Sequence, residues 1–195
     1  MTDNVADRLP IDGAWRVVPG VHRDHRGSFD AWFDGAAVAG QAGHRFPVAQ
    51  ANCSVSRRNV IRGIHFAASP PGQAKYVTCV RGAVFDVVVD VRLGSPSYGR
   101  WEHFYLDDRE RAAVYIAEGL GHAFMALTDE AIVVYLCSAP HDPGRQQGLN
   151  PLDPGLGIRW PGAGSAVVSR RDAAAPTLRE AERAGLLPRY QTERG

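Results

Sequence analysis

Short runs of apolar residues alternate with turn residues along most of the chain. Glycine and proline, 21 and 13 of the 195 residues, are spread along the sequence and are not gathered in a linker. Runs rich in valine, isoleucine and aromatic residues are each bounded by such turn residues, which predicts short strands. Eight strands are expected, over residues 46–54, 60–66, 75–80, 84–91, 101–106, 113–117, 123–127 and 131–137. This spacing is typical of a β-sandwich or a β-barrel.

The segments that connect and follow these strands add further expectations. Residues 80–84, with Gly82 at their centre, predict a hairpin between two of the strands. Residues 142–161 are rich in proline and glycine, which predicts a loop. Thr177 and Glu180 have the spacing of a capping box, so a helix is expected to begin there and to end at Gly185. The sequence therefore predicts one domain over residues 1–195, mainly β, with a central antiparallel barrel and a short C-terminal helical appendage.

The balance of charges excludes several partners. The chain carries 22 basic and 21 acidic residues, so neither nucleic acid nor a membrane surface is an expected partner. No apolar run approaches the ~18 residues that a membrane span needs, and the polar, acidic N-terminus is unlike a signal peptide. The three cysteines, Cys53, Cys79 and Cys137, lack a CxxC spacing. An odd number of isolated cysteines indicates reduced thiols, so we expect a soluble, cytoplasmic protein.

The first candidate for chemistry is His65, which follows Arg62 and Gly63 in a predicted strand. A histidine inside a strand is, taken alone, more often a hydrogen-bonded core residue than a catalytic one. Strict alternation along the strand places Arg62 and His65 on opposite faces. A bulge at Gly63 would re-aim one of the two side chains, since glycine inside a strand often marks such an irregularity.

A metal site is not expected. Small β-barrels often bind a metal through an H-x-H pair, a further glutamate and a later histidine. The two residues after His65 are phenylalanine and alanine, so this pair is missing. His22 and His25 fall in an expected N-terminal loop and His103 falls in a different strand. The local signature of a three-ligand site is therefore absent.

Several other polar residues have more than one interpretation. Asp86 and Asp90 share one face of a strand, and paired carboxylates can serve acid–base catalysis. We favour a structural interpretation, in which they form the polar face of a half-exposed strand or bind arginines. Tyr135 suits a strand on composition alone. His122 opens a strand or faces a loop, and Asp172 precedes the C-terminal helix, where it could simply begin a turn.

Taken together and in order, these residues resemble a known family. The resemblance extends over nearly the whole chain, and its motifs are long. The sequence resembles the dTDP-4-dehydrorhamnose 3,5-epimerase family in D-x-R-G-x-F at residues 24–29, Q-x-N-x-S-x-S at 50–56, R-G-I-H-F at 62–66, K-Y-V at 75–77, the run over 82–96, Y-G-R-W at 98–101, G-L-G-H-A-F at 119–124, Y-x-C at 135–137 and Asp172.

The resemblance implies a cupin-like jelly roll that forms a homodimer and epimerises C3, C5 or both of a dTDP-4-keto-6-deoxy sugar, with no metal or other cofactor. The C4 ketone acidifies the protons on C3 and C5. Epimerisation then needs a base on one face, stabilisation of the enolate, and an acid on the other face. By resemblance, His65 is the base and Asp172 orients it, Tyr135 is the acid, and Lys75, the one lysine of the chain, steadies the enolate charge.

Substrate-binding positions are also implied by the resemblance. Arg62 matches a contact to the sugar diphosphate, for which a bidentate guanidinium is well suited. The other matching positions are Arg26, Phe29, Gln50, Asn52, His122, His141 and Arg171.

One motif and three single positions depart from the pattern of the family, and the motif, usually A-H-G-F, is here G-H-A-F at residues 121–124. Ala31 stands where a glutamate is usual, His141 where a tyrosine is usual, and Gln146 where an acidic residue is usual. These departures leave open which of the two carbons is inverted.

Two alternative hypotheses come from other functional classes. A non-catalytic cupin could bind a nucleotide sugar, but a pure binder needs no opposed acid and base. A metal-dependent cupin enzyme would need the H-x-H pair that is missing. The homodimer is expected on a second ground, because the apolar, strand-forming N-terminal third offers sheet edges that need cover.

Overall fold

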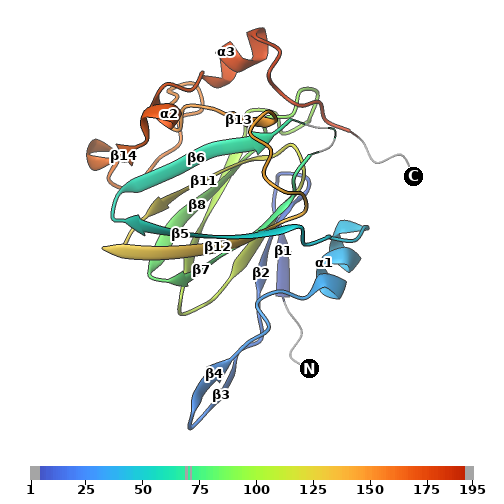
Figure 1. Cartoon of the computed structure of the whole chain (residues 1–195), viewed down its shortest axis with the longest axis vertical. Helices are drawn as coiled ribbons and strands as arrows, with labels where there is room; N and C mark the ends of the chain where they lie inside the picture. The colour runs from blue at the N-terminus through green and yellow to red at the C-terminus, as the bar shows by residue number, and fades with distance from the viewer. Residues whose placement is uncertain (1–4, 69, 71, 192–195) are drawn as a thin grey trace.

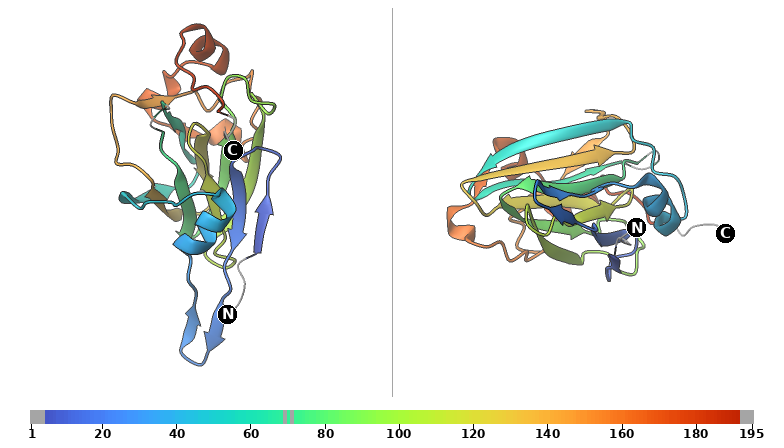
Figure 2. Two further views of the ribbon diagram at one scale, coloured as in Figure 1. Left: turned by 90° about the vertical axis from the view of Figure 1, so that its right-hand side faces the viewer. Right: turned by 90° about the horizontal axis from the view of Figure 1, so that it is seen from below.

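Two antiparallel sheets face each other and enclose the core. The structure is a computed structural model that describes residues 5–68, 70 and 72–191. The first sheet has the order β1 (Val5–Arg8), β2 (Ala14–Val18), β10 (Ala113–Ile116), β7 (Lys75–Arg81), β12 (Glu130–Cys137) and β5 (Gln50–Arg57). The second has the order β13 (Gln146–Gly148), β6 (Val60–Ala67), β11 (Gly121–Ala126), β8 (Ala83–Val89) and β9 (Trp101–Asp107), and β14 (Val167–Val168) pairs parallel with β6. Figure 1 shows the sheets as layers, and Figure 2 shows them from two further sides.

The eight predicted strands correspond to β5 through β12, with bounds shifted by a few residues. The predicted hairpin over residues 80–84 is wrong, because β7 and β8 lie in opposite sheets. The turn at Gly82 instead carries the chain across the fold. A Cβ atom at Gly82 would lie 2.2 Å from the Thr128 hydroxyl oxygen, so this crossing packs against the turn that joins β11 to β12. The links from β5 to β6, β9 to β10 and β11 to β12 cross between the sheets in the same way.

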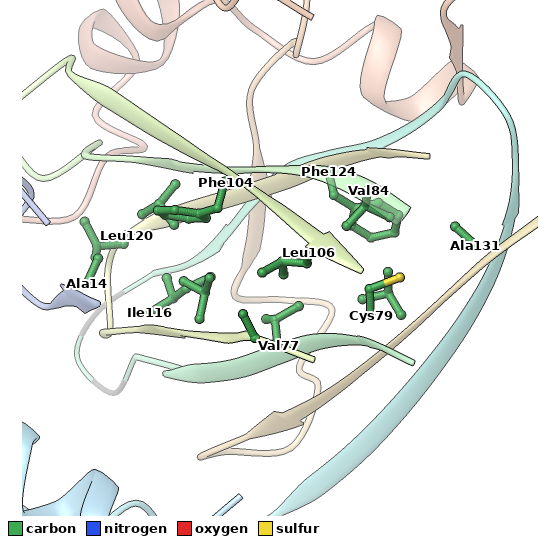
Figure 3. Packing of buried hydrophobic residues seen from close by; sticks show 14 of the residues in the cluster. Ala14, Val77, Cys79, Val84, Phe104, Leu106, Ile116, Leu120, Phe124 and Ala131 are labelled. Atoms are coloured by element: carbon green, nitrogen blue, oxygen red, sulfur yellow. The ribbon is translucent and has the colours of Figure 1, made fainter. Parts of the chain in front are cut away.

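The core lies between the two sheets and is almost entirely aliphatic and aromatic (Figure 3). Both sheets also bury part of their outer faces. The outer face of the second sheet packs against the C-terminal third, including Leu149, Trp160 and Leu187. The outer face of the first sheet packs against α1 (Gly35–Ala42) and the residues around it. The polar positions between the sheets are therefore exceptions in an apolar interior.

The C-terminal helix agrees with its prediction. α3 (Leu178–Arg183) begins after Thr177, whose side chain and that of Glu180 form both bonds of the capping box. Gly185 follows the helix with φ +67°, the left-handed conformation that ends helices. Before it lie the short helix α2 (Arg170–Ala173) and a 3₁₀ turn over Ala163–Ser165. The predicted loop over 142–161 contains the short strand β13. No helix among the described residues has the length and apolar character to cross a membrane.

A two-stranded hairpin projects from one end of the molecule. It consists of β3 (His22–Asp24) and β4 (Gly27–Phe29), and it extends away from both large sheets (Figures 1 and 2). His22, expected in a loop, thus lies in a strand. Every residue of the two strands is exposed. The sequence did not predict this hairpin, because the charged segment has no apolar alternation to reveal it.

Candidate active site

His65 and Asp172 form a hydrogen-bonded pair where β6 of the second sheet meets α2. His65 Nε2 lies 2.7 Å from Asp172 Oδ1. Asp172 belongs to α2, which packs against β6 (Figure 1), and Ser169 caps that helix through the Asp172 backbone N–H. The His65 side chain is 33% exposed, so a ligand can reach it. With Nε2 donating to the carboxylate, the lone pair remains on Nδ1.

The Asp172 carboxyl is held in its charged form. Burial opposes that charge most strongly, but the hydrogen bond and charge of His65, together with the bonds from Ser169 and the Gly63 N–H, outweigh it. The net result is a lowered pKa for Asp172. A charged Asp172 fixes the His65 ring and its tautomer.

An irregularity at Gly63 brings Arg62 and His65 to the same face of β6. The β6–β11 register shifts between the partners His65–His122 and Arg62–Phe124. Gly63 has φ +115°, and a Cβ atom there would lie 2.5 Å from the His122 carbonyl oxygen. Only glycine fits this conformation and this close approach. The bulge that the sequence suggested is therefore present.

A second histidine–carboxylate pair lies beside the first. His122 is the cross-strand partner of His65, and its Nε2 lies 2.8 Å from Asp86 Oδ2. Asp86 is completely buried, and its other oxygen, Oδ1, has no hydrogen-bond partner. The predicted half-exposed polar face is wrong for both aspartates, because Asp90 is buried too. Asp90 binds Arg92, with 2.8 Å between Oδ2 and Nη2, so its predicted arginine contact is confirmed.

The first sheet places a polar row opposite these histidines. On neighbouring strands, Lys75 is the partner of Cys137, which is the partner of Gln50. Tyr135 is likewise the partner of Asn52. Lys75 is buried, and its Nζ lies 3.5 Å from the His65 backbone carbonyl oxygen. The row thus meets the second sheet at His65.

The charges in this row respond to burial. Burial lowers the pKa of the Lys75 ammonium, and the nearby Cys137 and Asp86 oppose that shift. Burial and the Cys137 sulfur raise the pKa of the Tyr135 phenol, with Arg62 acting in the opposite direction. Tyr135 is therefore protonated at neutral pH, as an acid must be.

Hydrogen bonds link the remaining predicted residues of the first sheet. The His141 backbone N–H donates to Gln50 Oε1 at 2.8 Å, and Gln50 Nε2 donates to Asn52 Oδ1 at 2.7 Å. Arg62 reaches across from the second sheet and donates to Ser56 Oγ at 2.9 Å. Arg171 is exposed on α2, next to Asp172. Gln50, Asn52 and His141 are thus linked to one another, and Arg62 connects the two sheets.

Arg26 and Phe29 lie elsewhere. Both belong to the projecting hairpin, at the opposite end of Figure 1 from α2. Phe29 is 72% exposed, and the Arg26 guanidinium pairs with Asp24, with 2.6 Å between Nη2 and Oδ2. Within one chain they do not approach the pair formed by His65 and Asp172.

Two residues beside the site, Ser54 and Asp86, were not among the predicted site residues. Ser54 alternates with Asn52 and Ser56 along β5, and its buried hydroxyl has no partner. The alternating polar residues at 50, 52, 54 and 56 could have indicated it. Asp86 was considered for acid–base catalysis and interpreted as structural, because a buried carboxylate cannot be told from an exposed one by spacing. Among the described residues, no three histidine, cysteine or acidic side chains gather as a metal-binding group.

Residues 8–180 of the chain match the family model for dTDP-4-dehydrorhamnose 3,5-epimerase. A dTDP-4-dehydrorhamnose 3,5-epimerase of Mycolicibacterium smegmatis is 55% identical over 95% of this chain and 91% of its own length.

Solved structures show the same fold. A 4-keto-6-deoxy sugar epimerase from the novobiocin biosynthetic gene cluster of Streptomyces spheroides has a TM-score of 0.94 and 52% identity, covering 97% of this chain and 94% of that one. A 3'-monoepimerase from Streptomyces bikiniensis, in complex with dTDP-quinovose, has a TM-score of 0.91 and 55% identity, covering 94% and 92%. The predicted cupin-like jelly roll is confirmed, and the chain belongs to the dTDP-4-dehydrorhamnose 3,5-epimerase family.

Proposed function

We propose that His65, Lys75 and Tyr135 of this chain epimerise a dTDP-4-keto-6-deoxy sugar at C3, or at both C3 and C5. One observation carries the assignment of roles. His65 projects from the second sheet, whereas Tyr135 projects from the first, so the two side chains face each other across the interior. A sugar between them has a base on one face and an acid on the other, which is what inversion at carbon requires.

The steps follow from the chemistry of the ketone. His65 Nδ1 takes the proton from C3, and the electron pair of that C–H bond moves into the enolate, with negative charge on the C4 oxygen. The Lys75 ammonium stabilises this oxygen. The Tyr135 hydroxyl then donates its proton to C3 from the opposite face. Exchange with solvent restores His65 and Tyr135. Epimerisation at C5 proceeds by the same steps.

Nucleotide binding is assigned to polar groups around this centre. The exposed Arg62 and Arg171 suit the diphosphate, because guanidinium groups bind phosphate oxygens bidentately. Gln50, Asn52 and His141 line the first sheet, and the unpaired Ser54 hydroxyl adds a group that a ligand can satisfy. His122 lies beside His65, as the partner of Asp86.

A homodimer explains why Arg26 and Phe29 lie far from the active site of their own chain. Their hairpin projects from the molecule with an exposed aromatic ring, and a two-stranded hairpin alone is marginally stable in water. We infer that it docks on a second copy and supplies these residues to the nucleotide site there. The three free cysteines support the reducing, cytoplasmic location that we propose for the dimer.

A mixed dimer tests this exchange of hairpins. A His65→Asn chain lacks the base, and a Phe29→Ala chain lacks the ring. Both chains are co-expressed with different tags. In the mixed dimer, the subunit that keeps His65 then receives the hairpin with the intact Phe29 from the other chain. About half of the wild-type activity is expected in the purified mixed dimer. If each hairpin instead contributes to the site of its own subunit, the mixed dimer shows no restored activity.

The reaction itself is tested with dTDP-4-keto-6-deoxyglucose in D₂O, followed by NMR. The proposal predicts deuterium at C3, with or without deuterium at C5, and an inverted product. A protein that binds dTDP but incorporates no deuterium at either carbon is a binding protein, which contradicts the proposal.

A further inference from the structure

The hairpin that carries Phe29 needs a fixed direction if it is to serve a second copy. Its two strands have only three residues each and are exposed on both faces. Such a ribbon bends easily unless the rest of the chain holds it. The contacts at its base therefore decide where Phe29 points.

Arg111 makes those contacts. Its Nη2 donates to Ser28 Oγ at 2.7 Å, and its Nη1 pairs with Asp30 Oδ1. The Asp30 side chain is only 10% exposed, although its neighbours along the hairpin are open to solvent. The turn that carries Arg111 is itself fixed, because Glu110 pairs with Arg16 of β2. A short chain of contacts thus links the hairpin to the first sheet.

Because side chains alternate along an extended chain, the contacts of Arg111 also determine which way Phe29 points. Ser28 and Asp30 point to the same side of the extended chain, and Phe29 points to the opposite side. Because Arg111 binds both Ser28 and Asp30, it holds that side against its own subunit. Phe29 is left facing outward, and it is 72% exposed.

The backbone conformation at Arg111 is unusual for an arginine. Arg111 has φ +58°, the left-handed region that glycine or asparagine adopts more readily. A turn between two strands could use glycine at this position without cost. The Arg111 side chain reaches the base of the hairpin, and its Nε also donates to the Asp108 carbonyl oxygen of its own turn.

We propose that Arg111 is a positioning residue for the neighbouring subunit: by binding Ser28 and Asp30, it aims Phe29 and Arg26 at the nucleotide site of a second copy of this chain. The inference rests on the proposed exchange of hairpins. The role proposed for Arg111 is to act through the direction of the hairpin and not through contact with the substrate.

The test is the affinity of the dimer for dTDP, with Arg111→Gly as the principal variant. Glycine relieves the left-handed backbone but leaves the largely buried Asp30 carboxylate without its partner, so a small decrease in the melting temperature is expected. The Kd for dTDP is expected to increase about tenfold, the effect of losing a charged hydrogen-bonding group. The kcat at saturating substrate is expected to be retained, since His65 and Tyr135 are untouched. Arg111→Lys keeps a positive charge beside Asp30, so its Kd for dTDP should lie between those of the wild type and Arg111→Gly.

Arg109→Ala is the matched control, because Arg109 is an exposed arginine of the same turn, and it should leave the Kd unchanged. A further mixed dimer, of Arg111→Gly and His65→Asn chains, should bind dTDP at wild-type affinity in the body that has His65. That site receives the correctly aimed hairpin of the other chain.

Two results would overturn the inference, and they differ in meaning. If Phe29→Ala weakens dTDP binding but Arg111→Gly does not, Arg111 does not aim the hairpin, and the exchange of hairpins stands. If Phe29→Ala also leaves the Kd unchanged, the exchange itself is wrong, and the role of Arg111 falls with it.

Discussion

Two histidine–carboxylate pairs lie side by side in the second sheet, yet their surroundings differ. His65 is one-third exposed, and its partner Asp172 accepts further hydrogen bonds from Ser169 and Gly63. His122 is 9% exposed, and its partner Asp86 is completely buried with one oxygen unpaired. The same two residue types therefore form one pair at the edge of the site and one beneath it.

Because the two pairs contain the same residue types, their exposure is what distinguishes them. An accessible imidazole held by a satisfied carboxylate can take a proton from a substrate and return it to solvent. The buried Asp86 carboxylate instead lies close enough to Lys75 to oppose the lowering of its pKa by burial. We interpret the first pair as the base and the second as support for the lysine. The predictions below test this division.

The largest effect is expected for His65→Asn, which removes the base and keeps a polar side chain. Removal of a general base costs about 10²–10⁴-fold in rate, so deuterium exchange at the sugar should nearly stop. The affinity for dTDP should persist, because the nucleotide contacts lie on other residues. Stopped exchange together with lost dTDP binding would indicate a folding defect instead.

Tyr135→Phe should separate exchange from inversion. His65 can still remove the proton, but the opposite face has lost its acid, so inversion should fall by about 10²-fold while exchange without inversion continues. Because burial raises the pKa of Tyr135, wild-type inversion should show no loss from its ionisation below about pH 10. A pH–rate profile measured for wild type and variant checks both points. Equal loss of exchange and inversion would contradict the assignment.

Asp172→Asn and Asp86→Asn should affect different quantities. The first should lower the exchange rate by roughly tenfold or more, because His65 loses its charged partner. The lowered pKa of Asp172 means that its charge stabilises the fold at neutral pH and that this contribution is lost as the pH falls through the lowered value. Acid unfolding monitored by circular dichroism should therefore be less steep in Asp172→Asn.

Asp86→Asn should instead lower the free energy of unfolding by about 1–3 kcal/mol, as expected when a charged buried hydrogen bond is weakened. Its effect on dTDP affinity should be small. Denaturant unfolding of the two variants under the same conditions gives the comparison directly. A larger stability loss in Asp172→Asn than in Asp86→Asn would reverse the division of tasks.

The smallest effect concerns two positions at which the sequence departs from the pattern of the family, Ala31 and His141. The altered positions 31 and 141 should align the two sugar carbons unequally with His65, so exchange at C3 and C5 should differ in rate. The double variant Ala31→Glu with His141→Tyr should bring the two rates closer, by a fewfold. NMR resolved at each carbon measures this. Equal wild-type rates that stay equal in the double variant would show that the two positions are silent.

Sequence patterns predicted the strands and the resemblance predicted the catalytic set, but their arrangement needed the fold. The eight central strands and the capping box at Thr177 follow from local signals. The crossing at Gly82 could not be distinguished from a hairpin, because the same turn residue serves both. Asp86 was placed at a surface because polar side chains normally lie there, and only the contact with His122 explains its burial.

The most direct test of the division of tasks is deuterium exchange at C3 and C5 in His65→Asn and in His122→Asn, each measured beside dTDP binding. The account predicts that His65→Asn loses exchange at both carbons and keeps its affinity for dTDP, whereas His122→Asn slows exchange at both carbons without abolishing it. Exchange that survives at one carbon in His65→Asn, and disappears there in His122→Asn, would make His122 the base for that carbon and contradict the account.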